Sequence, residues 1–191
     1  MIEIDRVLPS DRALALDSGN NWIWASAYLS VPSPESYLSR LEYYCVGCGL
    51  GPALGASLAR PDRITVFAVG DGGLMMTLAD LDTAVRLGLP LVVLVFNDGM
   101  FGSDVHYLRW AGFDDDIARV PPVSFEETAR GLGADAMTIA TYDQVEELGR
   151  RVSQLAGPLV VDCRVTGELR PDATDWFLAG RYGTPAVATG G

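Results

Sequence analysis

The chain has 191 residues, of which 49% are apolar and 20% are charged, an ordinary balance for a single globular domain. This amount of apolar material is enough to bury a core, which excludes a disordered, collagen-like or disulfide-scaffold protein. Fourteen Lys and Arg residues against 25 Asp and Glu residues give a net charge of −11. Because so acidic a surface repels phosphate backbones and anionic lipids, we expect neither nucleic acid nor a membrane as a partner.

No targeting signal is visible in the chain. The N-terminus, Met1–Asp5, lacks the basic flank and the apolar stretch of a signal peptide. The longest nearly continuous apolar run, residues 87–96, is too short to span a bilayer. Three cysteines, an odd number, fit a reducing compartment. We therefore expect a cytoplasmic protein.

Strand-like and helix-like segments alternate along the chain. Runs that are apolar on both faces, as in parallel sheets covered by helices, lie at 13–16, 64–69, 91–96 and 159–165, with a weaker one near 136–139. Helical spacing of apolar residues follows at 50–58 and 74–85. Capping boxes, Ser124 with Glu127 and Thr141 with Gln144, predict two further helix starts.

This alternation predicts an α/β fold, doubly wound, with a mainly parallel sheet of five to six strands and helices on both faces. We place this domain at residues 1–165. The remaining segment, 166–191, is rich in Gly, Pro and Thr, and we expect a C-terminal arm that is extended or partly disordered.

Glycine, Asp and Asn residues cluster where three of the predicted strands end, at 17–21, 70–73 and 97–102. In open α/β sheets, ligands bind beyond the carboxyl ends of the strands. The turn at 70–73 follows a strand and opens a helix, so its backbone N–H groups can approach an anion. Taken alone, such a turn is more often only a tight turn, and Asp71 could be only a helix N-cap.

The second acidic cluster strengthens the case for a site. Asp71 and Asp98 lie 27 positions apart, which is the length of one helix and one strand. That spacing returns the chain to the same sheet edge, so the two carboxylates are expected to lie close together. With a diphosphate, such a pair makes a hard-oxygen site that suits Mg²⁺.

Three collinear stretches resemble a known family. Residues 70–90 followed by 95–99 resemble the thiamine-diphosphate-binding signature, and most of all that of the acetolactate synthase and 2-oxo-acid decarboxylase group. Residues 46–56, with 59–63, resemble the glycine-rich helix start of that group and the lead-in to the strand after it, and residues 17–25 resemble its first phosphate turn. The resemblance covers about residues 6–165 and implies the thiamine-diphosphate-binding fold, with thiamine diphosphate and Mg²⁺ as cofactors.

The resemblance also implies a role for individual residues. The side chains of Asp71 and Asp98 and the carbonyl of Met100 would hold Mg²⁺, although position 98 is commonly Asn in the family. Val46 matches the apolar residue that props the cofactor in its bent shape, and it is smaller than the usual Met, Leu or Ile. The implied cofactor-binding positions are Ser18, Gly19, Asn20, Asn21, Val46, Gly47, Gly70, Asp71, Gly72, Gly73, Asp98, Met100, Phe101 and Gly102.

Other chemistry-bearing residues lie outside this set. Asp104 and His106, the only histidine, fall where relatives place substrate-side residues, so we assign them a catalytic role as an alternative to a structural one. Cys45 and Cys48 have the spacing of a redox or zinc pair, but no second pair or histidine lies nearby in the sequence, and a structural role is favoured. The run 114–116 of three aspartates is expected to be a solvated loop.

The family's active site needs a glutamate on a separate pyrimidine-binding domain, and 191 residues leave no room for one. We therefore expect the diphosphate-binding subunit of a split enzyme, a heterodimer or heterotetramer that is active only with its partner. A fragment of a longer chain is the alternative, and Met1 with a complete domain favours the split subunit.

The expected reaction is decarboxylation of a 2-oxo acid with transfer of the acyl-anion equivalent to a carbonyl acceptor, as in an acetolactate-synthase-like carboligase. A simple decarboxylase subunit, similar to those of sulfopyruvate or phosphonopyruvate decarboxylase, is one alternative. A non-catalytic regulatory subunit is another. A nicotinamide-binding domain is disfavoured, because no Gly-x-Gly-x-x-Gly turn follows the first strand.

Overall fold

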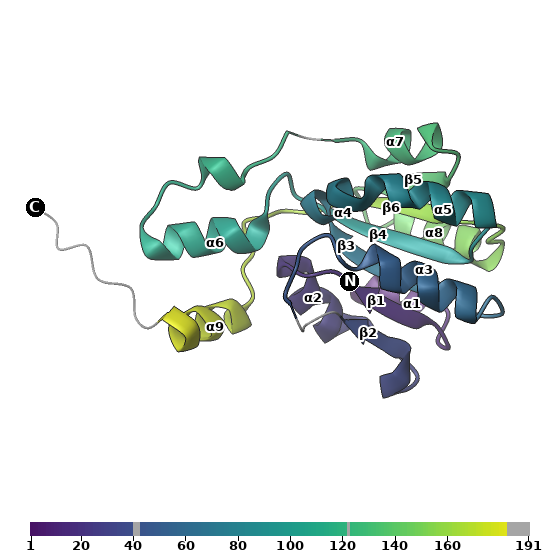
Figure 1. Ribbon diagram of the computed structural model, residues 1–191, viewed down its shortest axis with the longest axis horizontal. Helices are drawn as coiled ribbons and strands as arrows, with labels where there is room; N and C mark the ends of the chain where they lie inside the picture. Colours follow the sequence, from purple (N-terminus) through teal and green to yellow (C-terminus); the bar gives the residue numbers. More distant parts are fainter. Residues whose placement is uncertain (40–42, 122, 183–191) are drawn as a thin grey trace, which may run out of the picture.

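The structure is a computed structural model that describes residues 1–39, 43–121 and 123–182. Within these ranges, six strands form a parallel sheet in the order β2-β1-β3-β4-β6-β5 (Figure 1). The strands are β1 Ala13–Leu16, β2 Tyr37–Ser39, β3 Thr65–Gly70, β4 Leu91–Asn97, β5 Asp135–Ile139 and β6 Leu159–Arg164. This sheet confirms the expected α/β class.

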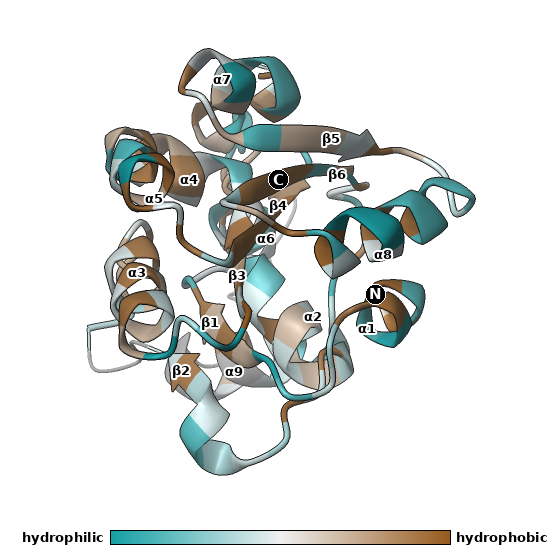
Figure 2. Ribbon diagram, turned by 90° about the vertical axis from the view of Figure 1, so that its right-hand side faces the viewer, coloured by the Kyte–Doolittle hydropathy of each residue, from teal (hydrophilic) through white to brown (hydrophobic). Residues whose placement is uncertain are grey.

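Helices cover both faces of the sheet (Figure 2), with α1, α2 and α8 on one face and α3, α4, α5 and α7 on the other. Helices α6 and α9 lie apart from these layers, to the left of the sheet in Figure 1. The helices are α1 Ile2–Val7, α2 Asn20–Tyr28, α3 Leu50–Ala59, α4 Asp71–Thr77, α5 Leu81–Leu87, α6 Gly102–Ala111, α7 Phe125–Gly131, α8 Gln144–Ser153 and α9 Asp172–Tyr182. Three short 3₁₀ turns lie at Pro34–Ser36, Leu78–Asp80 and Asp116–Ala118.

The strand register explains why the runs are apolar on both faces. Side chains alternate between the two faces of a strand, so neighbouring residues of a strand join different cores. The row Leu14, Val66, Val92 and Leu159 packs under α1, α2 and α8. The next row, Ala15, Phe67, Val93 and Val160, packs under the helices of the opposite face.

The sequence predicts one helix over 74–85, whereas the structure has two helices there, α4 and α5. The helical segment starts earlier, at Asp71, and is interrupted at Thr77, where the 3₁₀ turn separates α4 from α5. The Thr77 hydroxyl donates to the Gly73 carbonyl at 3.5 Å, a local bond that bends helices. The apolar spacing is still used, since both Leu74 and Leu81 are fully buried.

The two capping boxes behave differently. Ser124 caps α7 as expected, because its hydroxyl accepts the N–H of Glu127 at 3.3 Å. The second helix begins at Gln144 instead of directly after Thr141. There the Gln144 side chain accepts the N–H groups of Ala140 and Thr141, at 2.7 and 3.0 Å, which holds 140–143 as a turn.

The segment 166–191 differs in part from the expected extended arm. Residues Asp172–Tyr182 form helix α9, in which Leu178 is buried. Residues 183–191 lie outside the described part of the chain, and the boundary at residue 165 stays a prediction. None of the helices in the described ranges has the length and apolar character needed to cross a membrane.

Candidate functional site

A cavity of about 770 Å³ opens at the carboxyl edge of the sheet. Every cofactor-binding position expected from the sequence lines it except Gly47. Strands β1, β3 and β4 each end at this edge, and the turns that follow them carry the Asn, Asp and Gly residues to it. The structure therefore brings together residues that are up to 84 positions apart, from Ser18 to Gly102.

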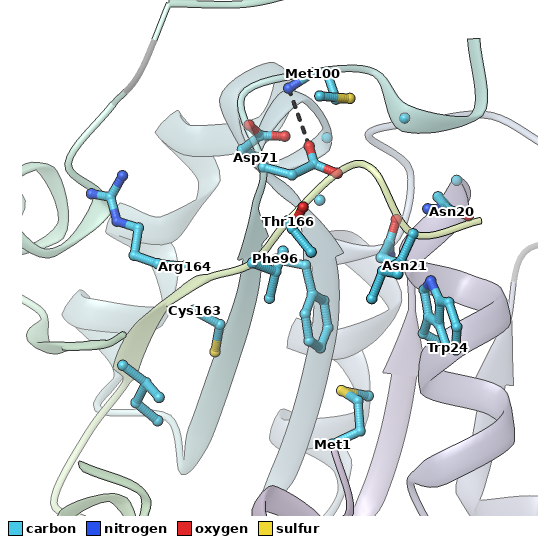
Figure 3. A pocket seen from close by; sticks show the side chains of 18 of the residues that line it. Met1, Asn20, Asn21, Trp24, Asp71, Phe96, Met100, Cys163, Arg164 and Thr166 are labelled. Atoms are coloured by element: carbon cyan, nitrogen blue, oxygen red, sulfur yellow. Dashed lines mark hydrogen bonds between the residues drawn. The ribbon is translucent and has the colours of Figure 1, made fainter. Parts of the chain in front are cut away.

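Asp71 and Asp98 form a carboxylate pair at the polar end of this cavity (Figure 3 labels Asp71). Asp71 is buried, and its two oxygens accept the N–H groups of Gly72 and Gly99, both at 2.8 Å. Asp98 accepts the N–H of Met100 at 3.1 Å, the dashed line in Figure 3. The turn after β4 is thus tied to the turn after β3, which keeps the carboxylates side by side.

Both carboxylates are costly to keep ionised at this position. Burial raises the pKa of Asp71, and the hydrogen bonds from Gly72 and Gly99 partly oppose this. Burial and the neighbouring charge of Asp71 raise the pKa of Asp98 to about 6. A cation between the two would remove both penalties, since an opposite charge favours the ionised form.

The turns beside the pair lie close together because glycine leaves room. A Cβ on Gly72 would collide with the ring of Phe101, and Gly19 has a φ of +128°, which side chains rarely tolerate. Asn20 lies against Gly102, so the start of α2 faces the start of α6. Asn21 is buried and donates to the carbonyl of Asp17 at 3.4 Å.

Two outer segments brace this edge. Phe101 donates its N–H to the carbonyl of Ala118 at 2.8 Å, and Val120 donates to Gly99 at 2.9 Å. On the other side, Gly167 lies so close to Met100 that a Cβ there would collide with its side chain. The turn 98–101 is held from both sides, so its groups meet a ligand in a fixed geometry.

Asp17 is a site residue that the sequence reasoning missed. Its side chain is only 1% exposed, and its carboxylate accepts three consecutive backbone N–H groups, those of Gly47, Cys48 and Gly49. Gly47 therefore serves this contact and not the cavity lining. The available signal was an Asp directly after a buried strand, the same position that Asp71 and Asp98 occupy relative to theirs.

The other half of the cavity is apolar. Phe96, Cys163 and Ile139 are neighbours in register at the ends of β4, β6 and β5, and all three line it. Figure 3 shows Phe96 and Cys163 below Asp71, on the side of Met1. Burial raises the pKa of the Cys163 thiol to about 12, so this thiol is not a nucleophile near neutral pH.

The two expected catalytic residues have different positions. Asp104 is exposed and lines the cavity. His106 is 3% exposed, is not among the lining residues, and its Nε2 has no hydrogen-bond partner in the part of the chain that the structure describes. Burial and the nearby Arg170 and Arg109 lower its pKa, so it is neutral at pH 7. A role in proton transfer stays a prediction.

The remaining candidates lie outside the cavity. Cys45 and Cys48 are exposed, and neither forms a disulfide within the described part of the chain. The carboxylates of residues 114–116 come within 4.8 Å of one another, but Asp115 pairs with Arg109 and Arg119, as in an ordinary charged loop.

Comparisons with known proteins agree with this geometry. The family model described as "Thiamine pyrophosphate enzyme, C-terminal TPP binding domain" matches residues 17–163, which include the carboxylate pair and the three glycine turns. The chain belongs to this family of thiamine-diphosphate-dependent enzymes, in its acetolactate-synthase-like group.

Relatives and solved structures point the same way. Acetolactate synthase from Bacillus subtilis (strain 168) is 27% identical over 168 residues, which are 85% of this chain and 29% of that protein. Sulfoacetaldehyde acetyltransferase from Alcaligenes xylosoxydans xylosoxydans is 26% identical over 153 residues, 77% of this chain and 24% of that protein. Benzoylformate decarboxylase from Polynucleobacter necessarius shares the fold, with a TM-score of 0.81 at 16% identity, over 89% of this chain and 33% of that one. The chain thus spans less than a third of the two relatives' length.

The residues present fit the family's cofactor. Two neighbouring carboxylates, one of them with its pKa raised by burial and by the charge of the other, suit a hard divalent cation. Beside them, backbone turns and the side chains of Ser18 and Asn20 supply hydrogen-bond donors for diphosphate oxygens. Together these groups could hold a metal and a diphosphate at one end of the cavity.

Proposed function

We propose that this chain forms the diphosphate- and Mg²⁺-binding half of an active site that acts on 2-oxo acids. The observation that carries the proposal is the carboxylate pair Asp71 and Asp98 beside three glycine turns at the polar end of the cavity. Burial and the charge of Asp71 together raise the pKa of Asp98 to about 6, an arrangement typical of sites that bind a cation.

In this proposal, Asp71, Asp98 and the carbonyl of Met100 hold Mg²⁺. The Ser18–Asn21 turn, the 70–73 turn, Phe101 and Gly102 would enclose the diphosphate, and Val46 would support the cofactor from the cavity wall. When bound, thiamine diphosphate supplies the carbon nucleophile for the 2-oxo carbonyl and the electron sink for loss of CO₂. The chain's own residues orient this group and keep its charges out of bulk water. Asp104 faces the cavity and is positioned to contact the substrate.

The rest of the active site comes from a pyrimidine-binding unit that carries the activating glutamate. The relatives are more than three times longer than the matched region, and the described residues fold around a single sheet. We place that unit on a separate partner subunit, in a heterodimer or heterotetramer. The first experiment is to purify the tagged chain from its own host and to identify by mass spectrometry what accompanies it.

That experiment has clear outcomes. A stoichiometric partner with a pyrimidine-binding α/β domain supports the split enzyme. Recovery of this sequence within a longer polypeptide contradicts the split, but not the cofactor site. We further expect the purified chain alone to turn over no 2-oxo acid, and measurable turnover without a partner would contradict the claim that half of the site lies elsewhere.

For the reaction we favour decarboxylation followed by carboligation, because the two relatives compared above are named as a synthase and an acetyltransferase. The assay supplies the assembled complex with pyruvate and a second 2-oxo acid, and follows CO₂ release and the carbon skeleton of the product. A product one carbon shorter than the substrate, with no joined skeleton, would contradict carboligation and favour a simple decarboxylase.

A further inference from the structure

We propose that Asp17 is a positioning residue for the cofactor cavity, because its carboxylate holds residues 46–49 in the conformation that sets Val46 at the cavity wall. The inference rests on the proposed function, since the place of Val46 matters to a ligand only if the cavity binds one.

Asp17 is itself fixed in the sheet. It follows directly after β1, and its N–H donates to the carbonyl of Ala68 in β3 at 3.0 Å. Its own carbonyl accepts the side-chain amide of Asn21 at 3.4 Å. The side chain is 1% exposed. The carboxylate therefore projects from a rigid base and not from a mobile turn.

The carboxylate binds a segment that is neither helix nor strand. Gly47 donates to one oxygen at 2.8 Å, while Cys48 and Gly49 donate to the other at 3.0 and 2.9 Å. Residues 43–49 form neither helix nor strand, so these three N–H groups lack the partners that a ladder would provide. An ionised carboxylate has only acceptor positions and can satisfy all three.

Glycines leave the space that the carboxylate fills. A Cβ on Gly73 would collide with the carboxylate, and a Cβ on Gly49 would lie 3.0 Å from the Cα of Asp17. Asp17 is thus packed between the segment and the first turn of α4. Neither side can shift without moving the other, because interiors are close-packed.

Val46 is the residue through which this arrangement reaches the cavity. It directly precedes Gly47 and lines the cavity. Its Cγ1 lies 3.4 Å from where a Cβ on Gly73 would stand, so it lies against the turn proposed to hold the diphosphate. Loss of the Asp17 contacts would free Val46 without altering any group proposed to touch the metal.

The first test uses the wild-type chain without cofactor. Hydrogen exchange should show the amides of Gly47, Cys48 and Gly49 protected by at least about tenfold relative to unstructured peptide rates. Unprotected exchange at these three amides would contradict the anchoring role directly.

The second test compares Asp17→Asn with Asp162→Asn, a matched change at another fully buried aspartate. Asp162 accepts the N–H of Phe125 at 3.0 Å and the side chain of Asn97 at 2.9 Å. It also pairs with Arg164 at 2.8 Å, and it does not itself line the cavity, although Arg164 does. In Asp17→Asn, the new side-chain amide would direct an NH₂ group at a backbone N–H. Asp17→Ser, which keeps one acceptor in a smaller volume, replaces this variant if it does not fold.

Thiamine diphosphate with saturating Mg²⁺ is titrated into the complexes that all three proteins form with the pyrimidine-binding partner. We expect Asp17→Asn to lose the acceptor for at least one of the three amides, which should exchange faster, and to weaken binding by about tenfold, the value of one lost buried hydrogen bond. In Asp162→Asn, the exchange of these amides and the affinity for thiamine diphosphate should both match the wild type. Absent binding by the wild type would contradict the proposed function and this inference with it, whereas equal binding by wild type and Asp17→Asn would overturn the positioning role alone.

Discussion

The two halves of the cavity stand on the same sheet edge and meet where β4 ends. In β4, Phe96 points to the apolar half, Asn97 to the opposite face, and Asp98 follows at the polar end. Strand alternation accounts for Asn97, which points away from the face of Phe96. Asp98 differs from Phe96 because it lies beyond the end of β4, in the turn where its carboxylate accepts the N–H of Met100. In the polar half, the buried charges of Asp71 and Asp98 destabilise the fold until a cation binds. The apolar half stabilises the fold whether or not a ligand is present.

The largest expected effect comes from removing a carboxylate of the polar half. Asp71→Ala should abolish Mg²⁺-dependent binding of thiamine diphosphate, with a loss of at least about a hundredfold, because it removes a charged ligand and frees the turn after β4. Titration calorimetry on the wild type and the variant measures this. Asp80→Ala, an exposed aspartate beyond α4, is the matched control. Full Mg²⁺-dependent activity of an assembled complex that carries Asp71→Ala would refute the site assignment.

The apolar half should respond in stability and not in metal binding. Phe96→Ala removes a half-buried ring that packs against the α1, α2 and α8 core, and should lower the free energy of unfolding by about 2 kcal/mol. Urea unfolding of the cofactor-free chain gives this value. Mg²⁺ affinity should stay within about twofold of the wild type, since the carboxylates are unchanged. A parallel loss of metal affinity would show that the two halves are not independent.

Asp98→Asn sharpens the comparison because it should stabilise the cofactor-free protein. The pKa of Asp98 is raised to about 6, so the folded state binds a proton that the unfolded state, near its ordinary value of 3.8, has released. The stability linked to that proton is present below pH 4 and is lost as the pH rises to about 6.

The variant removes this pH-dependent loss. We expect Asp98→Asn to exceed the wild type at pH 8 by about 1–2 kcal/mol, with a smaller difference at pH 4.5, while Mg²⁺ affinity falls about tenfold. Urea titrations without Mg²⁺ at both pH values test the sign. A difference that is the same at both would mean that the charge of Asp98 is not costly in the folded state.

Sequence patterns predicted the parts of this molecule in which a local signal coincides with the final structure. Long apolar runs marked β3, β4 and β6, because strands covered on both faces have few other solutions. Asp71 and Asp98 were predicted to be neighbours because the 27 positions between them are the length of one helix and one strand, which returns a parallel chain to the same sheet edge. Strand β2 escaped prediction, since its three residues are only partly buried. Asp17 escaped as well, because its role depends on N–H groups about 30 positions away that no local pattern connects to it.

The smallest expected effect lies outside both halves, at His106. Burial is the main cause that lowers its pKa, the charges of Arg170 and Arg109 add to this, and Glu168 and Asp175 partly oppose it. A lowered pKa in the folded state means that the neutral ring is favoured by folding. The linked stability is complete above the ordinary value of 6.5 and is lost as the pH falls below it.

His106→Leu should cancel that dependence, because it keeps an apolar side chain in the buried position and cannot take up a proton. Between pH 7.5 and 5.5, the wild type should lose up to about 1 kcal/mol of unfolding free energy relative to the variant. Urea unfolding of both proteins at each pH gives the difference, and Asp98 cancels from it since both chains carry that residue. If the ring instead reaches the cavity as a proton donor, its pKa should change when thiamine diphosphate and Mg²⁺ bind, and NMR titration of this only histidine would show the shift. An unshifted pKa would leave His106 a structural residue of α6, and Asp104 the one expected catalytic side chain that faces the ligand.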